Sequence, residues 1–455
     1  MSNLTCFKSY DIRGRLGPEL NEGVAALIGR AFAQELSARR VVLGRDCRAS
    51  SASLAMAVSV VLQEAGATVL DLGLCGTEEV YFATGHFGAD GGIEVTASHN
   101  PMDYNGMKLV KAGAAPLEPA LLARVKARAE AGDFITAAPG RSEAVDCRAA
   151  YVERVLSFVD LSALRPLKLL VNAGNGTAGP TFDAIAAALE RQGAPLTFLR
   201  IDHDADGSFP NGIPNPLLPE NQPRTAAAVR AAGADFAVAW DADFDRCFFF
   251  DADGGFVAGE YVVGLLAEAF LAKEPGATVI HDPRVIWNTQ DVVARAGGRA
   301  VMARTGHAYL KARMRETGAV YGGEMSAHHY FRDFMACDSG MIPWLLVAEL
   351  LSRRGQGLKA VLAERRAAFP SSGEVNFRVA DVLASVRAVE AIYAPLADTR
   401  DDLDGLSLTF GDWRLNLRAS NTEPLLRLNI EARGRADLVA EKLDEVAAVI
   451  RRQAG

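Results

Sequence analysis

The sequence predicts an α/β protein with several domains, and three observations favour this fold class. At 455 residues, the chain exceeds the roughly 250–300 residues at which a single hydrophobic core stops growing. Helical and strand-like patterns alternate over most of its length, and a weak internal repeat occurs three times. The composition, 49% hydrophobic and 23% charged, is typical of a globular protein with substantial cores.

The alternation of helices and strands begins near the N-terminus. Residues 21–36 place apolar side chains at helical spacing, and the apolar run 41–44 predicts a buried strand. A second helical pattern over 54–62 leads into the strand-like segment 68–73. Residues 91–98 then predict another strand, so this part of the chain has the layering of an α/β unit.

The internal repeat joins a Gly-Ala turn to a strand and then to a polar loop. Its three copies are GADGGIEVTASHN (88–100), GADFAVAWDADFD (233–245) and TGAVYGGEMSAH (317–328). Each copy is preceded by a strand-like segment that itself follows a helix. These segments are 65–73, 192–200 and 296–304. Open parallel sheets bind ligands beyond the carboxyl ends of their strands. We therefore expect three related mixed α/β sheet units whose polar loops line one central cleft.

The last stretch of the chain has a different pattern. It contains a strand-like segment at 374–379, a helix near 382–395, strands at 407–418 and 425–433, and a closing helix from about residue 436. This pattern predicts a C-terminal α+β domain.

Bulk properties exclude several functional classes. The six cysteines show no C-x-x-C spacing, which argues against a zinc site or a disulfide framework. The net charge of −8 argues against nucleic acid or an anionic membrane as the main partner. We expect a cytoplasmic protein, because no apolar stretch has the roughly 18 residues of a membrane span and the N-terminus lacks a signal-peptide pattern.

Ser98 stands in the loop after the first of the three strand ends. Pro101 cannot extend a sheet ladder, so Ser98 is expected to project from a loop. A serine in such a place commonly does no more than hydrogen-bond its own turn. No G-x-S-x-G elbow surrounds it, which weakens acyl transfer and leaves phosphoryl transfer open.

Three carboxylates, Asp241, Asp243 and Asp245, follow the second strand end, and Arg246 comes next. Such a cluster repels itself unless a cation neutralises it. Oxygen ligands on a compact loop suit Mg²⁺, which also leaves room for a phosphate oxygen. A solvated acidic turn is the simpler interpretation, but it accounts less well for three alternating aspartates after a buried strand.

Two further loops carry polar side chains suited to a phosphorylated sugar. The first has two guanidiniums and several short donors, which favour a phosphate site over an ordinary polar hairpin: Arg418, Ser420, Asn421, Thr422 and Arg427. In the other loop, Glu324 and Ser326 could hydrogen-bond sugar hydroxyls. His307 is equally compatible with a helix start that has no catalytic part.

Taken in this order, the loops resemble those of the α-D-phosphohexomutase family. Two further landmarks are Tyr10-Asp11-Ile12-Arg13-Gly14 and Gly44-Arg45-Asp46, and the stretches EVTASHNPMDYNGMKLV and GGEMSAHHYFRDF are specific in combination. The resemblance spans nearly the whole chain and implies four domains: a phosphoserine-loop domain (1–150), a metal-binding domain (151–255), a sugar-binding domain (256–370) and a phosphate-binding domain (371–455).

The resemblance also implies roles for individual residues. Ser98 would carry the transferable phosphate and contact the magnesium ion that Asp241, Asp243 and Asp245 ligate. Five residues would serve as binding or proton-transfer groups: Tyr10, Arg13, Lys108, His307 and His328. Sugar or phosphate would be bound by Arg246, Arg284, Glu324 and Ser326, and the phosphate that does not react by Arg418, Ser420, Asn421, Thr422 and Arg427.

Two positions depart from the family pattern. Ala242 stands where the metal loop usually has glycine, and alanine would strain a backbone that requires positive φ by about 1 kcal/mol or more. Arg284 stands where some relatives have a lysine proposed as an acid or base, and an arginine is a poor proton carrier. General catalysis is then expected from Lys108 or a histidine.

The implied reaction interconverts the 6-phosphate and 1-phosphate of mannose and feeds nucleotide-sugar and polysaccharide synthesis. It would use Mg²⁺, with a hexose 1,6-bisphosphate as intermediate and activator, in a monomer or weak homodimer. Activity toward glucose phosphates, alone or in addition, is the nearest alternative. A glucosamine phosphate is less expected, because that branch typically has glutamine where Met325 stands. A magnesium-dependent phosphatase using Asp241 as nucleophile and a non-catalytic sugar-phosphate binder are more remote.

Overall fold

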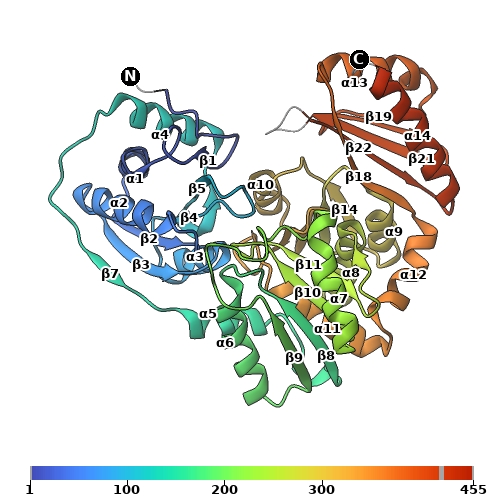
Figure 1. Ribbon diagram of the computed structural model, residues 1–455, viewed down its shortest axis with the longest axis horizontal. Coiled ribbons are helices and arrows are strands. Elements are labelled where there is room, and N and C mark those ends of the chain that lie inside the picture. The colour runs from blue at the N-terminus through green and yellow to red at the C-terminus, as the bar shows by residue number, and fades with distance from the viewer. Residues whose placement is uncertain (1–2, 420–424, 453–455) are drawn as a thin grey trace. The chain divides into compact units, whose positions relative to one another are not determined.

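The computed structural model describes residues 3–419 and 425–452 (Figure 1). The chain forms two compact units. The first comprises Met1–Phe256 and His328–Gly355, and the second comprises Val257–Ala327 and Gln356–Gly455. Among the described residues, no helix is both long enough and apolar enough to cross a membrane.

The first sheet lies at the N-terminal end of the first unit and has the strand order β1-β5-β4-β2-β3-β7. Strand β2 pairs in parallel with β3 and β4, whereas β5 pairs antiparallel with β4 and β1. The strands are β1 (Ile12–Arg15), β2 (Arg40–Arg45), β3 (Thr68–Leu74), β4 (Gly91–Val95), β5 (Tyr104–Lys111), β6 (Ala115–Pro116) and β7 (Ser142–Ala144).

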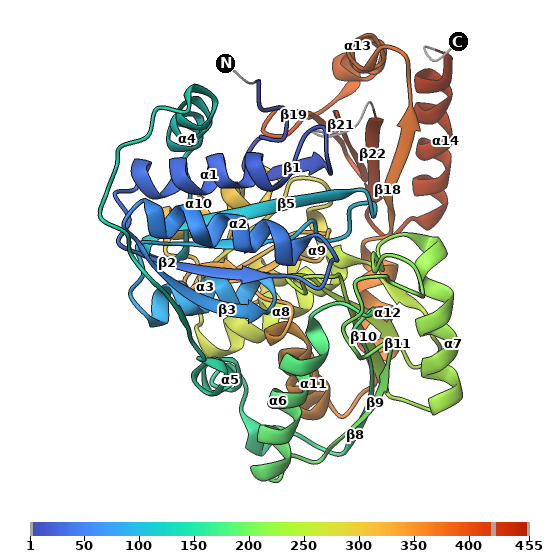
Figure 2. The same cartoon turned by 60° about the vertical axis from the view of Figure 1, so that its left-hand side comes forward.

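Four helices pack with this sheet: α1 (Glu22–Glu35), α2 (Ser51–Glu64), α3 (Thr77–His86) and α4 (Pro119–Ala131). Helices α1 and α2 lie side by side (Figure 2). The side chain of Asn21 caps α1 by accepting a hydrogen bond from the amide of Val24. Buried aliphatic side chains of the helices and strands, such as Ile28, Val58 and Ile93, form one core.

The second sheet has the order β12-β11-β10-β8-β9, and its edge strand β12 (Phe256–Val257) stands where the chain passes from the first unit to the second. Strand β8 pairs in parallel with β9 and β10, and β10 pairs antiparallel with β11. The strands are β8 (Leu167–Asn172), β9 (Leu196–Ile201), β10 (Phe236–Trp240) and β11 (Cys247–Asp251). Other elements of the unit are α5 (Arg148–Leu156), α6 (Ala178–Arg191), α7 (Gln222–Ala232), α11 (Ile342–Arg354), β16 (His329–Phe331) and β17 (Cys337–Asp338).

The second unit begins with an α/β part in which β13 pairs in parallel with β14 and β15. Its elements are α8 (Gly259–Lys273), β13 (Thr278–His281), α9 (Trp287–Arg295), β14 (Arg299–Met302), α10 (His307–Thr317), β15 (Tyr321–Gly323) and α12 (Leu358–Ala368).

The strand order confirms the internal repeat. In each α/β part, the first strand after a helix pairs in parallel with the next strand on one side and with the strand of the repeat on the other: β3-β2-β4, β9-β8-β10 and β14-β13-β15. Strands β4, β10 and β15 end directly before the loops of Ser98, Asp241 and Glu324. The predicted polar loops therefore follow equivalent strands of the three related α/β parts.

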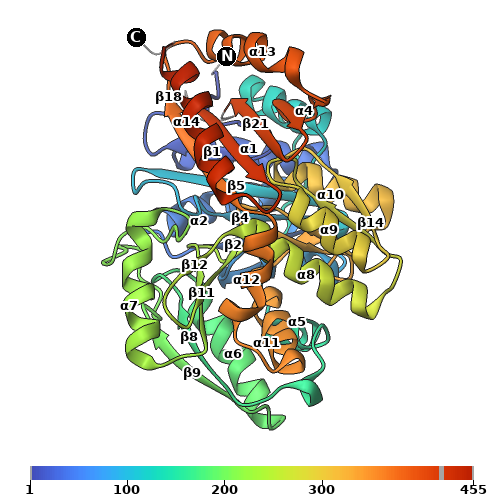
Figure 3. The same ribbon diagram turned by 90° about the vertical axis from the view of Figure 1, so that its right-hand side faces the viewer.

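The C-terminal part of the second unit is an antiparallel sheet of order β18-β22-β21-β20-β19, with two helices on its apolar side, which confirms the predicted α+β domain. Helix α14 runs alongside β18 (Figure 3). The elements are β18 (Ser371–Arg378), α13 (Val382–Tyr393), β19 (Thr399–Asp401), β20 (Leu406–Phe410), β21 (Trp413–Ala419), β22 (Leu425–Ala432) and α14 (Ala436–Arg452).

Candidate active site

The loop after β4 holds Ser98 in a constrained conformation. Ser98 has a φ of 48°, in the left-handed region that non-glycine residues seldom adopt. Its amide donates to Thr96 Oγ1 at 2.8 Å. The guanidinium of Arg48 donates to the carbonyl oxygens of Ser98 and Asn100 at 2.8 and 2.6 Å. These contacts fix the loop and thereby the direction of the serine hydroxyl.

The loop after β10 brings three carboxylates together. One oxygen of each of Asp241, Asp243 and Asp245 lies within 4.8 Å of the others, and all three side chains are buried. Thr77 at the start of α3 donates its hydroxyl to Asp243 Oδ2 at 2.6 Å. Buried carboxylates at this spacing are the hard oxygen ligands that Mg²⁺ prefers, so the residues fit a magnesium site.

The left-handed residue of this loop is Phe244, with a φ of 44°, whereas Ala242 does not have positive φ. The strain that alanine would suffer in place of glycine therefore does not arise at Ala242. Its carbonyl oxygen accepts a hydrogen bond from the amide of Thr177 at 2.9 Å.

The serine and the acidic cluster lie in direct contact. Ser98 Oγ donates to Asp241 Oδ2 at 2.6 Å. Arg246 donates to the same carboxylate at 2.6 Å and to Ser98 Oγ at 3.3 Å. The hydroxyl is close enough for one cation bound by the aspartates to contact it, and a guanidinium is placed to bind an anion attached there.

Lys108, on β5, neutralises part of this cluster. Its ammonium donates to Asp243 Oδ2 at 2.7 Å and also to Asp245. Burial alone would lower the pKa of Lys108, but the two carboxylates outweigh burial and raise it. Burial and the neighbouring Asp243 in turn raise the pKa of Asp245 to about 7. Lys108 therefore stays charged between the two carboxylates.

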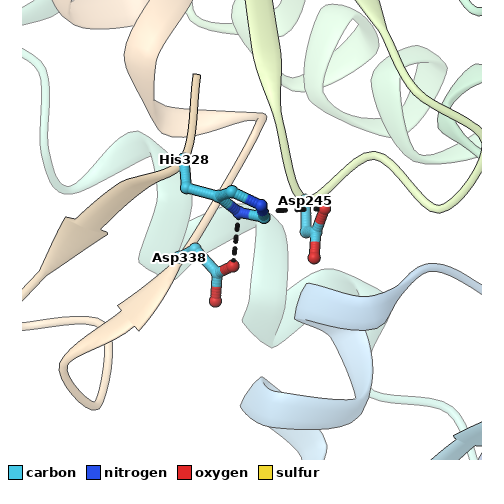
Figure 4. A group of neighbouring side chains, drawn as sticks. All are labelled: Asp245, His328 and Asp338. Carbon is cyan, nitrogen blue, oxygen red and sulfur yellow. Dashed lines mark hydrogen bonds and ion pairs between the residues drawn. The ribbon is translucent and has the colours of Figure 1, made fainter. Parts of the chain in front are cut away.

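The ring of His328 lies between Asp245 and Asp338 (Figure 4). Its Nδ1 is 2.9 Å from Asp338 Oδ2 on β17 and 4.0 Å from Asp245 Oδ1. Burial would lower the pKa of His328, but Asp245 and Asp338 outweigh burial and raise it. Asp338 thus orients the ring and stabilises its protonated form.

Arg13, from the first N-terminal landmark, lies on the strand that pairs with the strand of Lys108. Arg13 on β1 faces Gly106 of β5, two residues before Lys108. The charge of Arg13 acts against the raised pKa of Lys108. Tyr10 is half-buried in the segment before β1.

The second unit holds the residues predicted to bind sugar. Arg284 donates to Asp282 Oδ2 at 2.7 Å and to Ser326 Oγ at 3.3 Å. Glu324 accepts a hydrogen bond from the amide of Gly306 at 2.8 Å. His307 is the first residue of α10, as the helix-start interpretation predicts.

Two of the predicted phosphate-binding residues are described and lie on neighbouring strands. Arg418 of β21 and Arg427 of β22 are directly opposite each other. Both contact Glu374, at 3.0 and 3.1 Å. Three further predicted residues of this group lie outside the described part of the chain: Ser420, Asn421 and Thr422.

Comparison with known proteins identifies the family. Four models described as phosphoglucomutase/phosphomannomutase match in chain order: α/β/α domain I at residues 5–136, domain II at 149–255, domain III at 258–369 and the C-terminal domain at 374–449. The chain belongs to the phosphoglucomutase/phosphomannomutase family.

Curated members of this family are similar over their full length. A phosphomannomutase of Salmonella montevideo is 57% identical, with 98% of this chain and 99% of the relative covered. A phosphomannomutase of Escherichia coli K12 is 55% identical, with 96% and 97% covered. A protein named for phosphohexose mutases, from Xanthomonas campestris, is 54% identical, with 98% and 99% covered.

Solved structures agree on the fold. A phosphoglucomutase/phosphomannomutase family protein from Burkholderia thailandensis has a TM-score of 0.88 at 33% identity, over 100% of this chain and 99% of the other. A magnesium-containing structure of an Aspergillus fumigatus N-acetylphosphoglucosamine mutase with GlcNAc-6P has a TM-score of 0.64 at 16% identity, over 99% and 96%, which shows similarity of fold alone.

The sequence did not indicate several residues that hold the loops and side chains of the candidate site in place. Arg48 and Thr77 hold the serine and metal loops, Asp338 orients His328, and Glu374 lies between the arginines. Arg48 follows the landmark Gly44-Arg45-Asp46 by two residues, so proximity to that motif was an available signal. Thr77 and Glu374 contact residues far away in the sequence, and Thr77, Glu374 and Asp338 stand in no motif of their own.

Proposed function

We propose that this protein is a phosphomannomutase, an isomerase that interconverts mannose 6-phosphate and mannose 1-phosphate. Full-length relatives at 49–57% identity carry that name, which supports the substrate. The observation that carries the chemistry is the 2.6 Å contact between Ser98 Oγ and Asp241 Oδ2. It joins a hydroxyl able to carry a phosphoryl group to a carboxylate cluster that fits a magnesium ion.

In the proposed reaction, Ser98 begins as a phosphoserine. The C1 hydroxyl oxygen of mannose 6-phosphate forms a bond to that phosphorus while the bond between phosphorus and Ser98 Oγ breaks, and the hydroxyl proton passes to a base. Mannose 1,6-bisphosphate results. After it turns around, Ser98 Oγ attacks the 6-phosphorus, the C6 oxygen leaves with a proton, and mannose 1-phosphate is released.

The residues of the first unit divide the work of transfer. Asp241, Asp243 and Asp245 would hold Mg²⁺, which supplies stabilisation of the negative charge on the transferring phosphoryl group. Arg246 contacts Ser98 Oγ and is suited to align the phosphoryl oxygens. Lys108, held as an ammonium, provides a further charge, while His328, oriented by Asp338, is suited to exchange the proton.

Binding of the sugar is proposed for the second unit. Glu324 and Ser326 would hydrogen-bond sugar hydroxyls, and Arg284 would bind the substrate rather than transfer a proton. The phosphate that does not react would be held by Arg418, Ser420, Asn421, Thr422 and Arg427. Tyr10, Arg13 and His307 complete the proposed substrate-contacting groups.

We also propose that the four functional parts divide at residues 1–150, 151–255, 256–370 and 371–455. A hexose 1,6-bisphosphate is proposed as activator, since it can restore the phosphoserine when the intermediate escapes. The enzyme is proposed to be a cytoplasmic monomer or weak homodimer, which fractionation and light scattering test.

A second candidate is activity toward glucose phosphates as well. The name of the matching family includes phosphoglucomutase, and a 54% identical relative is named for phosphohexose mutases in general. Mannose and glucose differ only at C2. The ratio of kcat/KM for mannose 1-phosphate and glucose 1-phosphate decides between the candidates, and a strong glucose preference would contradict our assignment.

The decisive experiment is a coupled assay with mannose 1-phosphate, Mg²⁺ and catalytic bisphosphate. Ser98→Ala should abolish turnover and also the phosphatase-sensitive phosphoryl mass on the intact protein. Ser162→Ala, at an exposed serine that likewise bonds an aspartate, is the matched control and should leave both unchanged. Turnover of Ser98→Ala with release of inorganic phosphate would instead indicate a phosphatase. Wild type with neither activity would indicate a sugar-phosphate binder.

A further inference from the structure

The C-terminal sheet has one polar face that is largely buried. Successive side chains of a strand point to opposite faces, and in β21 and β22 every second residue is polar. The apolar residues between them, such as Leu415 and Leu428, belong to the core with α13 and α14. The polar residues share the other face: Arg414, Asn416 and Arg418 on β21, and Arg427, Asn429 and Glu431 on β22.

Two arginines stand directly opposite each other at one end of this face. Arg418 and Arg427 are cross-strand partners, and like charges in that position repel. Glu374, on the neighbouring strand β18, lies between them. Its Oε2 is 3.0 Å from Arg418 Nη2, and its Oε1 is 3.1 Å from Arg427 Nη1. One carboxylate therefore holds both guanidiniums on the sheet.

A third arginine reaches the same carboxylate from the α/β part of the second unit. Arg284 Nη1 lies 3.3 Å from Glu374 Oε2. Arg284 also contacts Ser326, so the carboxylate is linked to the loop proposed to bind sugar hydroxyls. Glu374 is thus the common partner of three arginines that we place in substrate binding.

In the described part of the chain, two of these arginines have an N–H donor that no hydrogen bond uses. Among the described residues, the Nε atoms of Arg284 and Arg418 are buried and have no hydrogen-bond partner. Both side chains are at most 6% exposed. Glu374 contacts all three guanidiniums, and Arg284 also pairs with Asp282. Clustered guanidiniums with unused buried donors are the features of a site built to receive an anion.

We propose that Glu374 is an internal substitute for the substrate phosphate and limits how tightly the arginines bind it. The inference rests on the proposed function and extends it to the regulation of phosphate affinity. Before substrate arrives, the carboxylate keeps the three guanidiniums together. An incoming phosphate must share them with Glu374, so binding is weaker than three unopposed arginines would give.

Weaker phosphate binding helps a mutase to release its intermediate. The bisphosphate intermediate must turn around, so the phosphate held by these arginines has to leave and be replaced by the other one. A binding site that held phosphate too tightly would trap the intermediate. A permanent competing carboxylate shortens that residence, because affinity within one interface is lost mainly through faster dissociation.

The first test measures inorganic phosphate binding by calorimetry in the presence of Mg²⁺. Glu374→Gln keeps the side-chain shape and removes the charge, and we expect phosphate to bind about tenfold more tightly. Adding Arg427→Gln to that variant should reverse the gain, which assigns it to these arginines rather than to Ser98. The matched control, Glu390→Gln, removes a carboxylate that pairs with Arg400 elsewhere in the same domain and should change nothing.

The second test is kinetic. Glu374→Gln should lower both KM for mannose 1-phosphate and kcat, whereas a residue that merely supports the fold would lower kcat and leave phosphate affinity unchanged or weaker. Glu374→Asp retains the charge and should stay within about twofold of wild type in phosphate affinity. It also provides a measurement if the glutamine variant does not fold. Unchanged or weaker phosphate binding by folded Glu374→Gln, or tenfold tighter binding by Glu374→Asp, overturns the inference. Wild type without mutase activity would refute the proposed function, and the calorimetry would still decide the role of Glu374.

Discussion

Replacing Glu431 by alanine should loosen the C-terminal sheet from the loop that carries Arg284. Glu431 Oε1 accepts from Arg414 at 3.1 Å, and its carboxylate also accepts from the amides of Ile286 and Trp287 at 3.0 and 2.9 Å. These amides lie at the N-terminus of α9, where no intrahelical acceptor is available. Arg414 in turn donates to the carbonyl oxygen of Arg284 at 2.9 Å.

The expected loss of stability follows from what the substitution leaves behind. Arg414 is 3% exposed, so alanine at 431 would leave a buried guanidinium without its carboxylate, which costs about 3–5 kcal/mol. Burial raises the pKa of Glu431 although Arg414 acts against it, so the ion pair compensates burial only in part. We therefore expect the lower end of that range, about 3 kcal/mol.

Two measurements check this value. Guanidinium chloride unfolding gives the free energy of unfolding, and hydrogen exchange of the α9 amides shows where protection is lost. Glu390→Ala, which breaks an exposed ion pair with Arg400, is the control and should cost less than about 1 kcal/mol. Adding Arg414→Met should recover part of the loss. A loss below about 1 kcal/mol, or strictly additive effects of the two changes, would refute the reasoning.

Four further predictions concern the first unit. His329 is buried, and burial lowers its pKa to about 3. Below about pH 6.5 the unfolded chain therefore binds a proton at His329 that the folded protein does not bind. The resulting stability is present above pH 6.5 and is lost as the pH falls, by about 2 kcal/mol at pH 5, and His329→Phe should remove this dependence in unfolding titrations. Asp338→Asn should lower kcat by about 10–100-fold and alter the ring ¹⁵N shifts of His328, while unaltered shifts would contradict an orienting role. Gly76→Ala should weaken Mg²⁺ binding in calorimetry, because the added Cβ would lie 2.1 Å from the ring of Phe244 in the metal loop; equal affinity would show that the ring yields freely. Chelation of divalent cations should abolish turnover reversibly, and full activity in excess chelator would exclude the proposed metal.

The sequence was sufficient where local pattern determines structure. Buried runs such as 236–240 and their preceding helices predicted the strands, because apolar periodicity reports burial directly. The polar residues that follow these runs indicated the functional loops of Ser98, Asp241 and Glu324. Parallel sheets bind ligands beyond the carboxyl ends of their strands, and each loop follows such an end. The C-terminal change of pattern predicted the separate α+β domain for the same reason.

Contacts between distant parts of the chain could not be predicted in this way. The sequence by itself determined which residues are able to carry a phosphoryl group or ligate a cation. Only the tertiary structure decided that Ser98 meets Asp241 across 143 positions, that Asp338 orients His328, and that Glu374 lies among three arginines. The physical reason is that side-chain chemistry is fixed residue by residue, whereas pairing, burial and the resulting charge balance depend on which sheets and loops pack together.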